Sequence, residues 1–380
     1  MSKSGDPLPP FWPTTLRQMS SIFFGTFSLF MSLAVIGAGL TVLIVILGLI
    51  LGGDQAKDSD PYEFISGTES SQQRILKINI NGPILGSPTE GNDPFNFGSL
   101  MGITYGYDIQ ADLKKAADDK TIKAVFLEIT TPGGTIFGSQ AIYDGIKAYQ
   151  EKTGHPVYAF VEGLSASGGV WAMVGADKIY ADYGSYVGSI GILGPNLTYY
   201  NQPTAINEGL LGGGVTTTGG IESVTISGGR GKDLGNPFRR PTPEELQQLQ
   251  AGVDQEYSNF VNHVAQARQI KPETLRTKMG AMIFGNQQAQ AYGLIDGTRN
   301  RPQTLEALAK AANIQGDYAL VRIRPDRQSL LSQLLESSQT SIKEQQAWLN
   351  AQTCTLTQYR ALAYYGNLHQ HCQTLPPAQP

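Results

Sequence analysis

The sequence predicts an α/β fold with a largely parallel sheet flanked by helices, and one membrane-spanning helix in front of it. Helical and strand-like periodicities alternate from residue 108 onward, as they do in successive βα units. Of the 380 residues, 41% are hydrophobic and 44 are glycine, which suits tight turns between strands and helices. An almost unbroken apolar run of thirty residues, 22–51, precedes these elements.

The apolar run is predicted to cross a membrane once. No charged side chain lies between Arg17 and Asp54, and thirty helical residues at about 1.5 Å each span roughly 45 Å, more than a hydrocarbon core. A cleaved signal peptide needs an apolar stretch only about half as long. A buried core helix is the alternative, but a run this long with no polar face favours a membrane span. The chain is therefore expected to begin with a cytoplasmic segment 1–21, an anchor 22–52 and a linker 53–73.

Charges on the two sides of the run predict its orientation. Lys3 and Arg17 precede it, whereas four acidic residues and only one lysine follow it within residues 54–63. The positive-inside rule places the amino terminus in the cytoplasm and the rest of the chain on the non-cytoplasmic side of a cell membrane. A disulfide between Cys354 and Cys372 could persist in that compartment, and free thiols are the open alternative.

The folded domain is expected over residues 74–300, followed by a C-terminal extension, 301–380. Predicted strands cover 75–80, 124–129, 157–161, 178–181 and 318–323, and predicted helices cover 108–118 and a stretch ending near 149. Thr242 and Glu245 form a capping box with Pro243 at the first helical position, so a long amphipathic helix should begin there. Residues 199–229 show little periodicity and are expected to be loop or weak hairpin.

Composition excludes several classes of function. The net charge is −4, and lysine and arginine are scattered, so a nucleic-acid partner is not expected. Histidine, cysteine and carboxylate residues nowhere show the spacing of metal ligands. No cofactor or metal is therefore predicted.

Ser167 is the leading candidate for a nucleophile. It is followed by Gly168 and Gly169 at the start of a predicted helix, where free N–H groups and the positive helix end would face an oxyanion. Thr131-Pro132-Gly133-Gly134 directly follows a buried strand, and the N–H groups of Gly134 and Gly168 could together form an oxyanion hole. Each motif taken alone is also typical of an ordinary turn.

No histidine has a setting that recommends it as the general base. His155 lies before a proline, His263 lies within the amphipathic helix, and His369 and His371 lie in the tail. A lysine can serve if burial or a nearby cation lowers its pKa. Lys232 lies among glycines close to Arg230, although Asp233 would act in the opposite direction. A solvated surface lysine is the alternative.

The sequence resembles the signal peptide peptidase family, also called protease IV, of the Clp-protease and crotonase-like superfamily. The resemblance covers residues 74–300. It rests on motifs that occur in the family's order: Thr131-Pro132-Gly133-Gly134, Ala166-Ser167-Gly168-Gly169, residues 176–181, residues 187–191, Gly231-Lys232-Asp233, residues 284–289 and residues 293–296.

The resemblance implies a crotonase/Clp-protease-like spiral of repeated ββα units, with Ser167 as nucleophile, Lys232 as base and Ser189 as the lysine's hydrogen-bond partner. Gly134 and Gly168 would supply the oxyanion donors. It also implies a homo-oligomeric ring in which the lysine comes from a neighbouring protomer. The chain departs from the family at Thr131 and Trp171, and the interval between Ser189 and Lys232 is long, which leaves Lys178 as the other nearby lysine.

These observations predict a membrane-anchored serine endopeptidase with a Ser-Lys dyad. Its substrates would be apolar, membrane-associated peptides such as remnant signal peptides. Two alternatives share the fold: a catalytically silent ring-forming scaffold that binds membrane proteins, and a crotonase-like acyl-CoA enzyme. Both Ser167 and Lys232 are present, which argues against the scaffold, and a non-cytoplasmic domain would lack CoA.

Overall fold

The structure is a computed structural model that describes residues 60–87, 102–201, 205–207, 214–216, 224–324 and 362–365. The chain divides into two compact units, Met1–Asp60 and Pro61–Pro380. The predicted anchor, 22–52, lies outside the described residues. Within the described ranges, no helix is both long enough and apolar enough to cross a membrane.

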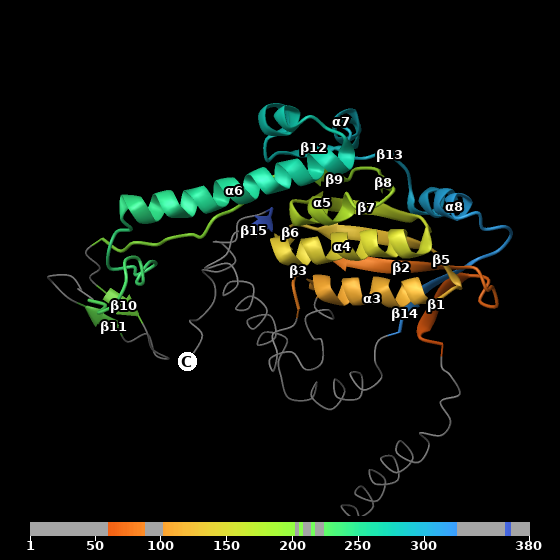
Figure 1. Cartoon of the computed structure of the whole chain (residues 1–380), viewed down its shortest axis with the longest axis horizontal. Helices are drawn as coiled ribbons and strands as arrows, with labels where there is room; N and C mark the ends of the chain where they lie inside the picture. The colour runs from red at the N-terminus through yellow and green to blue at the C-terminus, as the bar shows by residue number, and fades with distance from the viewer. Residues whose placement is uncertain are drawn as a thin grey trace, which may run out of the picture. The chain divides into compact units, whose positions relative to one another are not determined.

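A nine-stranded sheet forms the centre of the second unit (Figure 1). Seven of its strands lie side by side in the order β1-β14-β2-β5-β7-β8-β13, all parallel except for the pair β1 and β14, and β9 and β12 extend the sheet next to the end of β7. The strands of this sheet are β1 (Tyr62–Gly67), β2 (Arg74–Asn81), β5 (Ile122–Thr131), β7 (Val157–Ala166), β8 (Lys178–Ala181), β9 (Tyr186–Gly188), β12 (Ile283–Gly285), β13 (Gly297–Thr298) and β14 (Ala319–Ile323).

Helices cover both faces of the sheet, because the central strands bury alternate residues on opposite sides. On β5, Val125 and Leu127 join the core on one face while Phe126 packs on the other. One face is covered by α3 (Gly106–Asp118), α4 (Ile136–Thr153), α5 (Gly168–Met173) and the second half of α6 (Pro243–Arg268), and the other by α8 (Arg301–Ala311). A π-helical turn, η1 (Thr274–Met279), and α7 (Asn286–Ala291) follow α6.

A second, small sheet lies beside α5. Its strand order is β15-β6-β3-β4, formed by β3 (Ile84–Leu85), β4 (Thr104–Tyr105), β6 (Gly133–Thr135) and β15 (Leu362–Tyr364). Strand β6 therefore has a neighbour on each side, with β3 parallel and β15 antiparallel to it. Strands β10 (Ala205–Asn207) and β11 (Gly214–Thr216) form a separate antiparallel hairpin.

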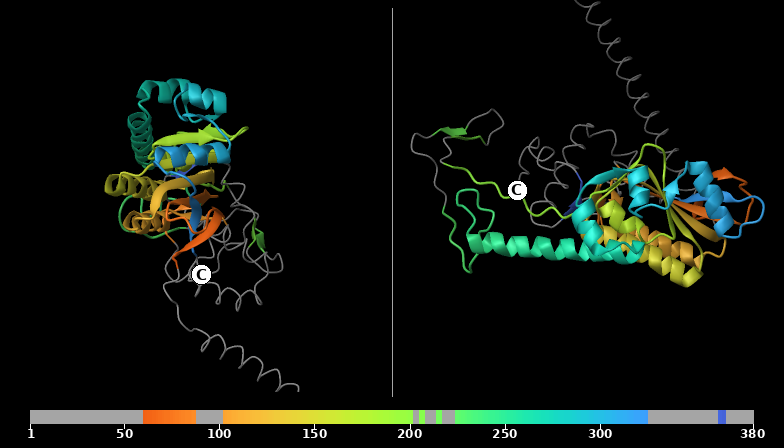
Figure 2. Two further views of the ribbon diagram at one scale, coloured as in Figure 1. Left: turned by 90° about the vertical axis from the view of Figure 1, so that its right-hand side faces the viewer. Right: turned by 90° about the horizontal axis from the view of Figure 1, so that it is seen from above.

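The first half of α6 extends away from the sheet (Figure 1 and Figure 2). The helix begins with the predicted capping box of Thr242 and Glu245 and runs for 26 residues. Its buried residues lie only in the second half, from Phe260 to Ala265. The ring of Phe260 lies 4.8 Å from that of Trp171 in α5, so packing fixes this end of the helix to the domain.

Several predicted boundaries differ from the structure. Strand β1 lies within the predicted linker, 53–73, and pairs with β14, so the folded part begins before residue 74. Helix α8 and strand β14 lie beyond residue 300, yet they pack on and pair with the central sheet, so residue 300 is no structural boundary. The small residues at 163–169 predict a turn, but those up to Ala166 form the second half of β7 and α5 begins at Gly168. Gly133-Gly134, also predicted as a turn, belongs to strand β6.

We expect Phe260→Ala to lower the free energy of unfolding by about 3–5 kcal/mol, because it leaves a cavity between α5 and α6. Leu246→Ala on the same helix is the matched control. Leu246 is 49% exposed, so its replacement should change stability by less than about 0.5 kcal/mol. Urea unfolding followed by circular dichroism measures both, and equal effects would contradict the packing described.

Candidate active site

Ser167 and Ser189 lie next to each other because two parallel strands end side by side. The first half of β7 pairs with β8, and after Gly163 its second half pairs with β9. In that second register Ala166 is the partner of Gly188. The residue that follows each strand end is a serine, and neighbouring strands lie about 4.8 Å apart.

Both serines adopt backbone conformations that are uncommon for residues other than glycine. Among the described residues, four non-glycine residues have positive φ, and Ser167 (φ 54°) and Ser189 (φ 59°) are two of them. Each such conformation costs about 1–3 kcal/mol and persists only where the surroundings enforce it. The Ser167 N–H donates to the Gly188 carbonyl at 2.9 Å, and the Ser189 N–H donates to that of Met282 at 2.7 Å. These bonds hold both turns in place.

The two predicted oxyanion glycines lie together beside Ser167. A Cβ atom placed on Gly168 would lie 3.0 Å from the amide nitrogen of Gly134 and 2.4 Å from Ser139 Oγ. A Cβ atom on Gly134 would lie 1.9 Å from the Ile84 carbonyl oxygen, so no side chain fits at that position. The absence of side chains leaves two backbone N–H groups close together, which is one requirement for an oxyanion hole.

His263 is partly buried and packs against aromatic side chains. Its ring lies 4.7 Å from that of Trp171 and 4.4 Å from that of Tyr143, and its Nε2 lies 2.9 Å from the Trp171 carbonyl oxygen. Burial lowers the pKa of His263, so the ring is neutral at physiological pH. The packing explains why an aromatic residue stands at Trp171, one helical turn after Ser167.

Lys178 lies at the opposite end of the sheet from Ser167. It is in register with Tyr158, eight residues before Ala166 on β7, a separation of roughly 26 Å along the strand at about 3.3 Å per residue. Its Nζ pairs with Asp296 at 3.2 Å. The structure therefore does not place Lys178 where it could serve Ser167 of the same chain.

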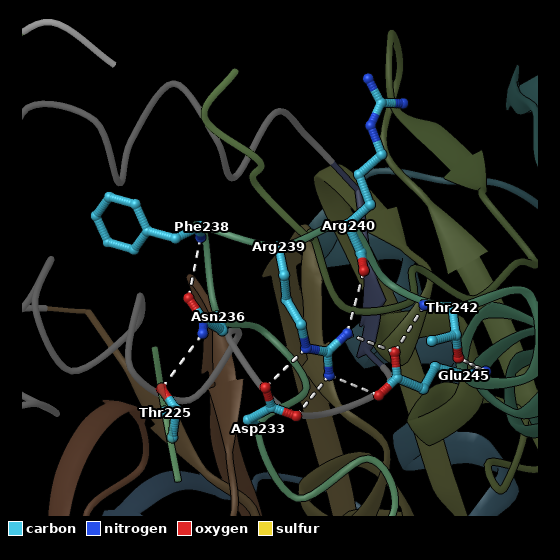
Figure 3. A network of polar contacts seen from close by, with 8 residues as sticks. All are labelled: Thr225, Asp233, Asn236, Phe238, Arg239, Arg240, Thr242 and Glu245. Atoms are coloured by element: carbon cyan, nitrogen blue, oxygen red, sulfur yellow. Dashed lines mark hydrogen bonds and ion pairs between the residues drawn. The ribbon is translucent and has the colours of Figure 1, made fainter. Parts of the chain in front are cut away.

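Lys232 lies in a turn that is fastened to the start of α6 through its neighbour Asp233. Arg239 makes paired hydrogen bonds of 2.7 Å to the Asp233 carboxylate and further bonds of 2.7 and 2.9 Å to Glu245, which completes the capping box of α6 (Figure 3). Both carboxylate oxygens of Asp233 therefore accept hydrogen bonds from Arg239. Asp233 is thus the ion-pair partner of Arg239 rather than of its neighbour Lys232.

The Arg239 network stays intact over the physiological pH range. Hydrogen bonds from Arg239 lower the pKa of Glu245 to about 2 and also lower that of Asp233. Because both pKa values are depressed in the folded chain, the stabilisation is complete above the ordinary value of 4.5 for glutamate. It is lost as the pH falls towards 2.

Lys232 is far from Ser167 of its own chain. A Cβ atom on Gly231 would lie 3.4 Å from Glu245 Oε1, so this turn is level with the first turn of α6. From Glu245 to Phe260, where α6 reaches α5, the helix runs 15 residues or roughly 22 Å. One chain therefore brings together Ser167, Ser189, Gly134 and Gly168, while Lys232 lies beyond the reach of a side chain.

A cleft of about 510 Å³ adjoins Ser189, and most of its lining was not predicted from the sequence. Its walls are Ser189, Gly191, Ile192, Leu193 and Ala281, together with Tyr364 and Tyr365 from the C-terminal extension. The sequence signal was the short apolar run 361–365 in an otherwise polar tail. Among the described residues, no group of three or more His, Cys, Asp or Glu residues could hold a metal ion.

Comparison with known proteins identifies the family. Residues 149–315 match the description "Peptidase family S49". The chain is 28% identical over 319 residues to a protein of Enterococcus faecium named as a signal peptide peptidase SppA, covering 79% of this chain and 86% of that one. It is 32% identical over 222 residues to a protease of Synechocystis sp., covering 58% and 74%. The chain belongs to the signal peptide peptidase (protease IV) family, peptidase family S49.

A structural likeness was also found to a ClpP1 variant from Listeria monocytogenes, with a TM-score of 0.36 and 13% sequence identity over 60% of this chain and 92% of that one. A likeness at this level supports no argument about function. The mixed α/β fold is instead shown by the sheets and helices of the chain itself.

Two S49 motifs outside the site have structural roles. In the first, Phe284 and Gly285 of β12 pair with Val187 and Tyr186 of β9, the strand that leads to Ser189. In the second, Asp296 accepts a hydrogen bond of 2.8 Å from the Ile179 N–H and pairs with Arg268 at 3.2 Å. These motifs therefore fix the strands that position the peptidase site.

We expect Ser167→Gly to be more stable than Ser167→Ala by about 1 kcal/mol. Both remove the hydroxyl, but only glycine relaxes at φ 54°, and its larger unfolded-state entropy offsets part of the gain. Urea unfolding of the two variants under one condition measures the difference. An alanine variant as stable as the glycine variant would show that the Ser167 turn carries no strain.

Proposed function

We propose that this S49 peptidase is a serine endopeptidase in which Ser167 attacks the substrate carbonyl and Lys232 is the general base. The observation that carries the proposal is the pair of serine turns, Ser167 and Ser189, next to the N–H groups of Gly134 and Gly168. A nucleophile, oxyanion donors and a hydroxyl able to hold a neutral amine are the parts that such a reaction needs.

The proposed reaction proceeds in two steps. Ser167 Oγ forms a bond to the peptide carbonyl carbon while Lys232 takes its proton, and the proton then passes to the leaving amine as the C–N bond breaks. Water, activated by the same lysine, hydrolyses the resulting ester and regenerates Ser167. Loss of one oxyanion donor in such sites costs about 2.7–4 kcal/mol of transition-state stabilisation. The mechanism requires no metal or cofactor.

We propose that the lysine acts on a neighbouring chain within a homo-oligomeric ring. The roughly 22 Å between the Lys232 turn and the α5 contact supports this arrangement, since α6 is continuous between them. Exposed apolar side chains on this part of the chain would suit an interface between protomers. They include Leu193 (42% exposed), Tyr199 (36%) and Tyr200 (50%).

The proposed substrates are apolar, membrane-associated peptides, including remnant signal peptides. The relative from Enterococcus faecium is named as a signal peptide peptidase, and the apolar run at 22–51 would hold the domain at a membrane. In this proposal the amino terminus is cytoplasmic and the peptidase domain lies on the non-cytoplasmic side.

We expect Ser167→Ala and Lys232→Ala each to lower kcat on an apolar fluorogenic peptide by about 10³-fold or more. Detergent-solubilised full-length protein is used, and size-exclusion chromatography should show the same oligomer as the wild type. Mixing the two inactive variants before assembly should restore part of the activity, because some interfaces then join an intact Ser167 to an intact Lys232. Failure of such mixtures to recover activity would mean that the lysine does not act across chains.

We expect Arg239→Ala to lower kcat by about 10²-fold through misplacement of the Lys232 turn. Arg240→Ala is the matched control, since Arg240 is the next residue, is exposed, and places its guanidinium 4.9 Å from the ring centroid of Tyr199. An exposed contact of this kind should contribute little, so the control should retain activity within about twofold. Both variants are measured in the same fluorogenic assay. Equal activities would mean that the position of the Lys232 turn does not affect the reaction.

A further inference from the structure

Strand β7 contains two more residues than the strand beside it, shortly before the proposed nucleophile. Val161 of β7 pairs with Ile129 of β5. The next pair in the ladder is Ser165 with Thr131, so four residue steps of β7 span two steps of β5. Such an insertion is a β-bulge, which bends a strand and re-aims the residues after it. It contains Gly163, whose φ of 84° glycine adopts readily.

The insertion brings the Ser167 turn level with β6, the strand that carries one of the oxyanion glycines. In an uninterrupted ladder, Gly163 would lie opposite Thr131. Ser167 would then lie two residues, or roughly 6.6 Å, farther along the strand. With the insertion, a Cβ atom on Gly133 of β6 would lie only 2.5 Å from the Gly168 nitrogen. The two glycine segments therefore meet because β7 contains the extra residues.

The interruption in β7 coincides with an interruption in the segment on its other side. Strand β7 pairs with β8 as far as Val161, and its pairing with β9 begins at Leu164. Residues 182–185 connect β8 to β9, so Ser185 lies level with the insertion. The strand ladder supplies no partner for the N–H group of the residue between, Gly163.

Hydroxyl groups take the place of the missing strand pairs at the insertion. Ser185 Oγ accepts a hydrogen bond of 3.0 Å from the Gly163 N–H and donates one of 3.1 Å to the Val161 carbonyl. On the β5 side, Thr130 Oγ1 donates to the Glu162 carbonyl at 2.7 Å. Ser185 is only 1% exposed, so solvent does not simply replace a hydroxyl removed from this position.

We propose that Ser185, assisted by Thr130, is a positioning residue of the peptidase site, whose hydroxyl holds the insertion in β7. The insertion in turn places Ser167 beside Ser189 and the oxyanion glycines. Both hydroxyls act through the strand and neither belongs to the reacting atoms. This proposal rests on the proposed function, because it takes Ser167 as the nucleophile. Loss of either hydroxyl should slow the attack by Ser167 and leave peptide binding intact.

We expect Ser185→Ala to lower kcat on the apolar fluorogenic peptide by about 10²-fold, since a displacement of about 1 Å at a reacting group has an effect of this size. KM should change by less than about twofold. Ser185→Thr retains the hydroxyl and should keep kcat within about threefold of the wild type. Detergent-solubilised full-length protein is used, at a temperature at which circular dichroism shows every variant to be folded.

Thr130→Val is the second variant, because Thr130 is exposed and its replacement leaves the core untouched. Loss of its hydrogen bond to the Glu162 carbonyl should lower kcat by up to about tenfold. Thr130→Ser keeps the hydroxyl and should restore the wild-type value. Wild-type kcat in both Ser185→Ala and Thr130→Val would overturn the proposal.

Ser71→Ala is the matched control. Ser71 Oγ also joins two backbone groups, accepting from the Gln73 N–H at 3.1 Å and donating to the Asp317 carbonyl at 2.9 Å. It precedes the start of β2, whereas Ser167 follows the end of the parallel strand β7, so the two lie at opposite ends of the sheet. The control should keep the wild-type kcat, and a loss equal to that of Ser185→Ala would overturn the proposal.

A serine-reactive fluorophosphonate distinguishes misplacement of Ser167 from loss of folded protein. A purely structural defect lowers the fraction of chains that can be labelled and leaves the rate constant of the remaining chains unchanged. Misplacement should instead give complete labelling of Ser185→Ala, with a rate constant lowered by about 10²-fold. A reduced labelled fraction with the wild-type rate constant would overturn the positioning role.

Hydrogen exchange makes the test independent of the proposed function. The Ser167 N–H donates to the Gly188 carbonyl, so it should exchange at least about tenfold faster in Ser185→Ala and at the wild-type rate in Ser71→Ala. Mass spectrometry of peptides that contain residue 167 measures this. If Ser167→Ala retained peptidase activity, the proposed nucleophile would be wrong, yet the exchange would still report the insertion. If Ser167→Ala were inactive, wild-type exchange and wild-type kcat in Ser185→Ala would overturn the role of Ser185 alone.

Discussion

The division of β7 between two partners is the constraint on which the candidate site depends. Its first half pairs with β8 and its second half with β9, and Gly163, with φ 84°, lies at the change. Because buried backbone groups must be paired, the second register fixes Ala166 opposite Gly188 and hence Ser167 beside Ser189. A slip of one residue would move one serine by about 3.3 Å and turn its side chain to the other face.

The candidate site consists largely of backbone groups. Packing around it offsets the free-energy cost of its strained backbone conformations. Two serines at positive φ and a cluster of glycines contribute little buried apolar area of their own. Directly behind them, Trp171 packs on Phe260 and His263, and its Nε1 donates to Gln140 Oε1 at 2.7 Å. The rigid layer of α5 and α6 therefore holds a conformation that the local sequence alone would not keep.

The central strands and the capped start of α6 could be predicted because their signals are local: apolar runs, and Thr242 three residues before Glu245. The second half of β7 was predicted as a turn because Gly163, Ser165 and Ala166 favour turns, and only pairing with β9 makes them a strand. Ser167, Ser189, Gly134 and Gly168 were predicted with the help of the family resemblance. The position of β15 could not be predicted, since its pairing with β6 joins distant parts of the chain.

The proposed substrate groove and the proposed general base are positioned by different parts of the molecule. The proposed groove is built within one chain, from β6 with its partner β15, the turn at Ser167 and the cleft beside Ser189. The proposed base lies at the far end of a helix that packs on the domain only from Phe260 onward. Within the described residues of one chain, Ser167 is buried and the proposed base Lys232 is out of its reach. In the proposed ring, the neighbouring chain supplies the lysine, so assembly would precede cleavage.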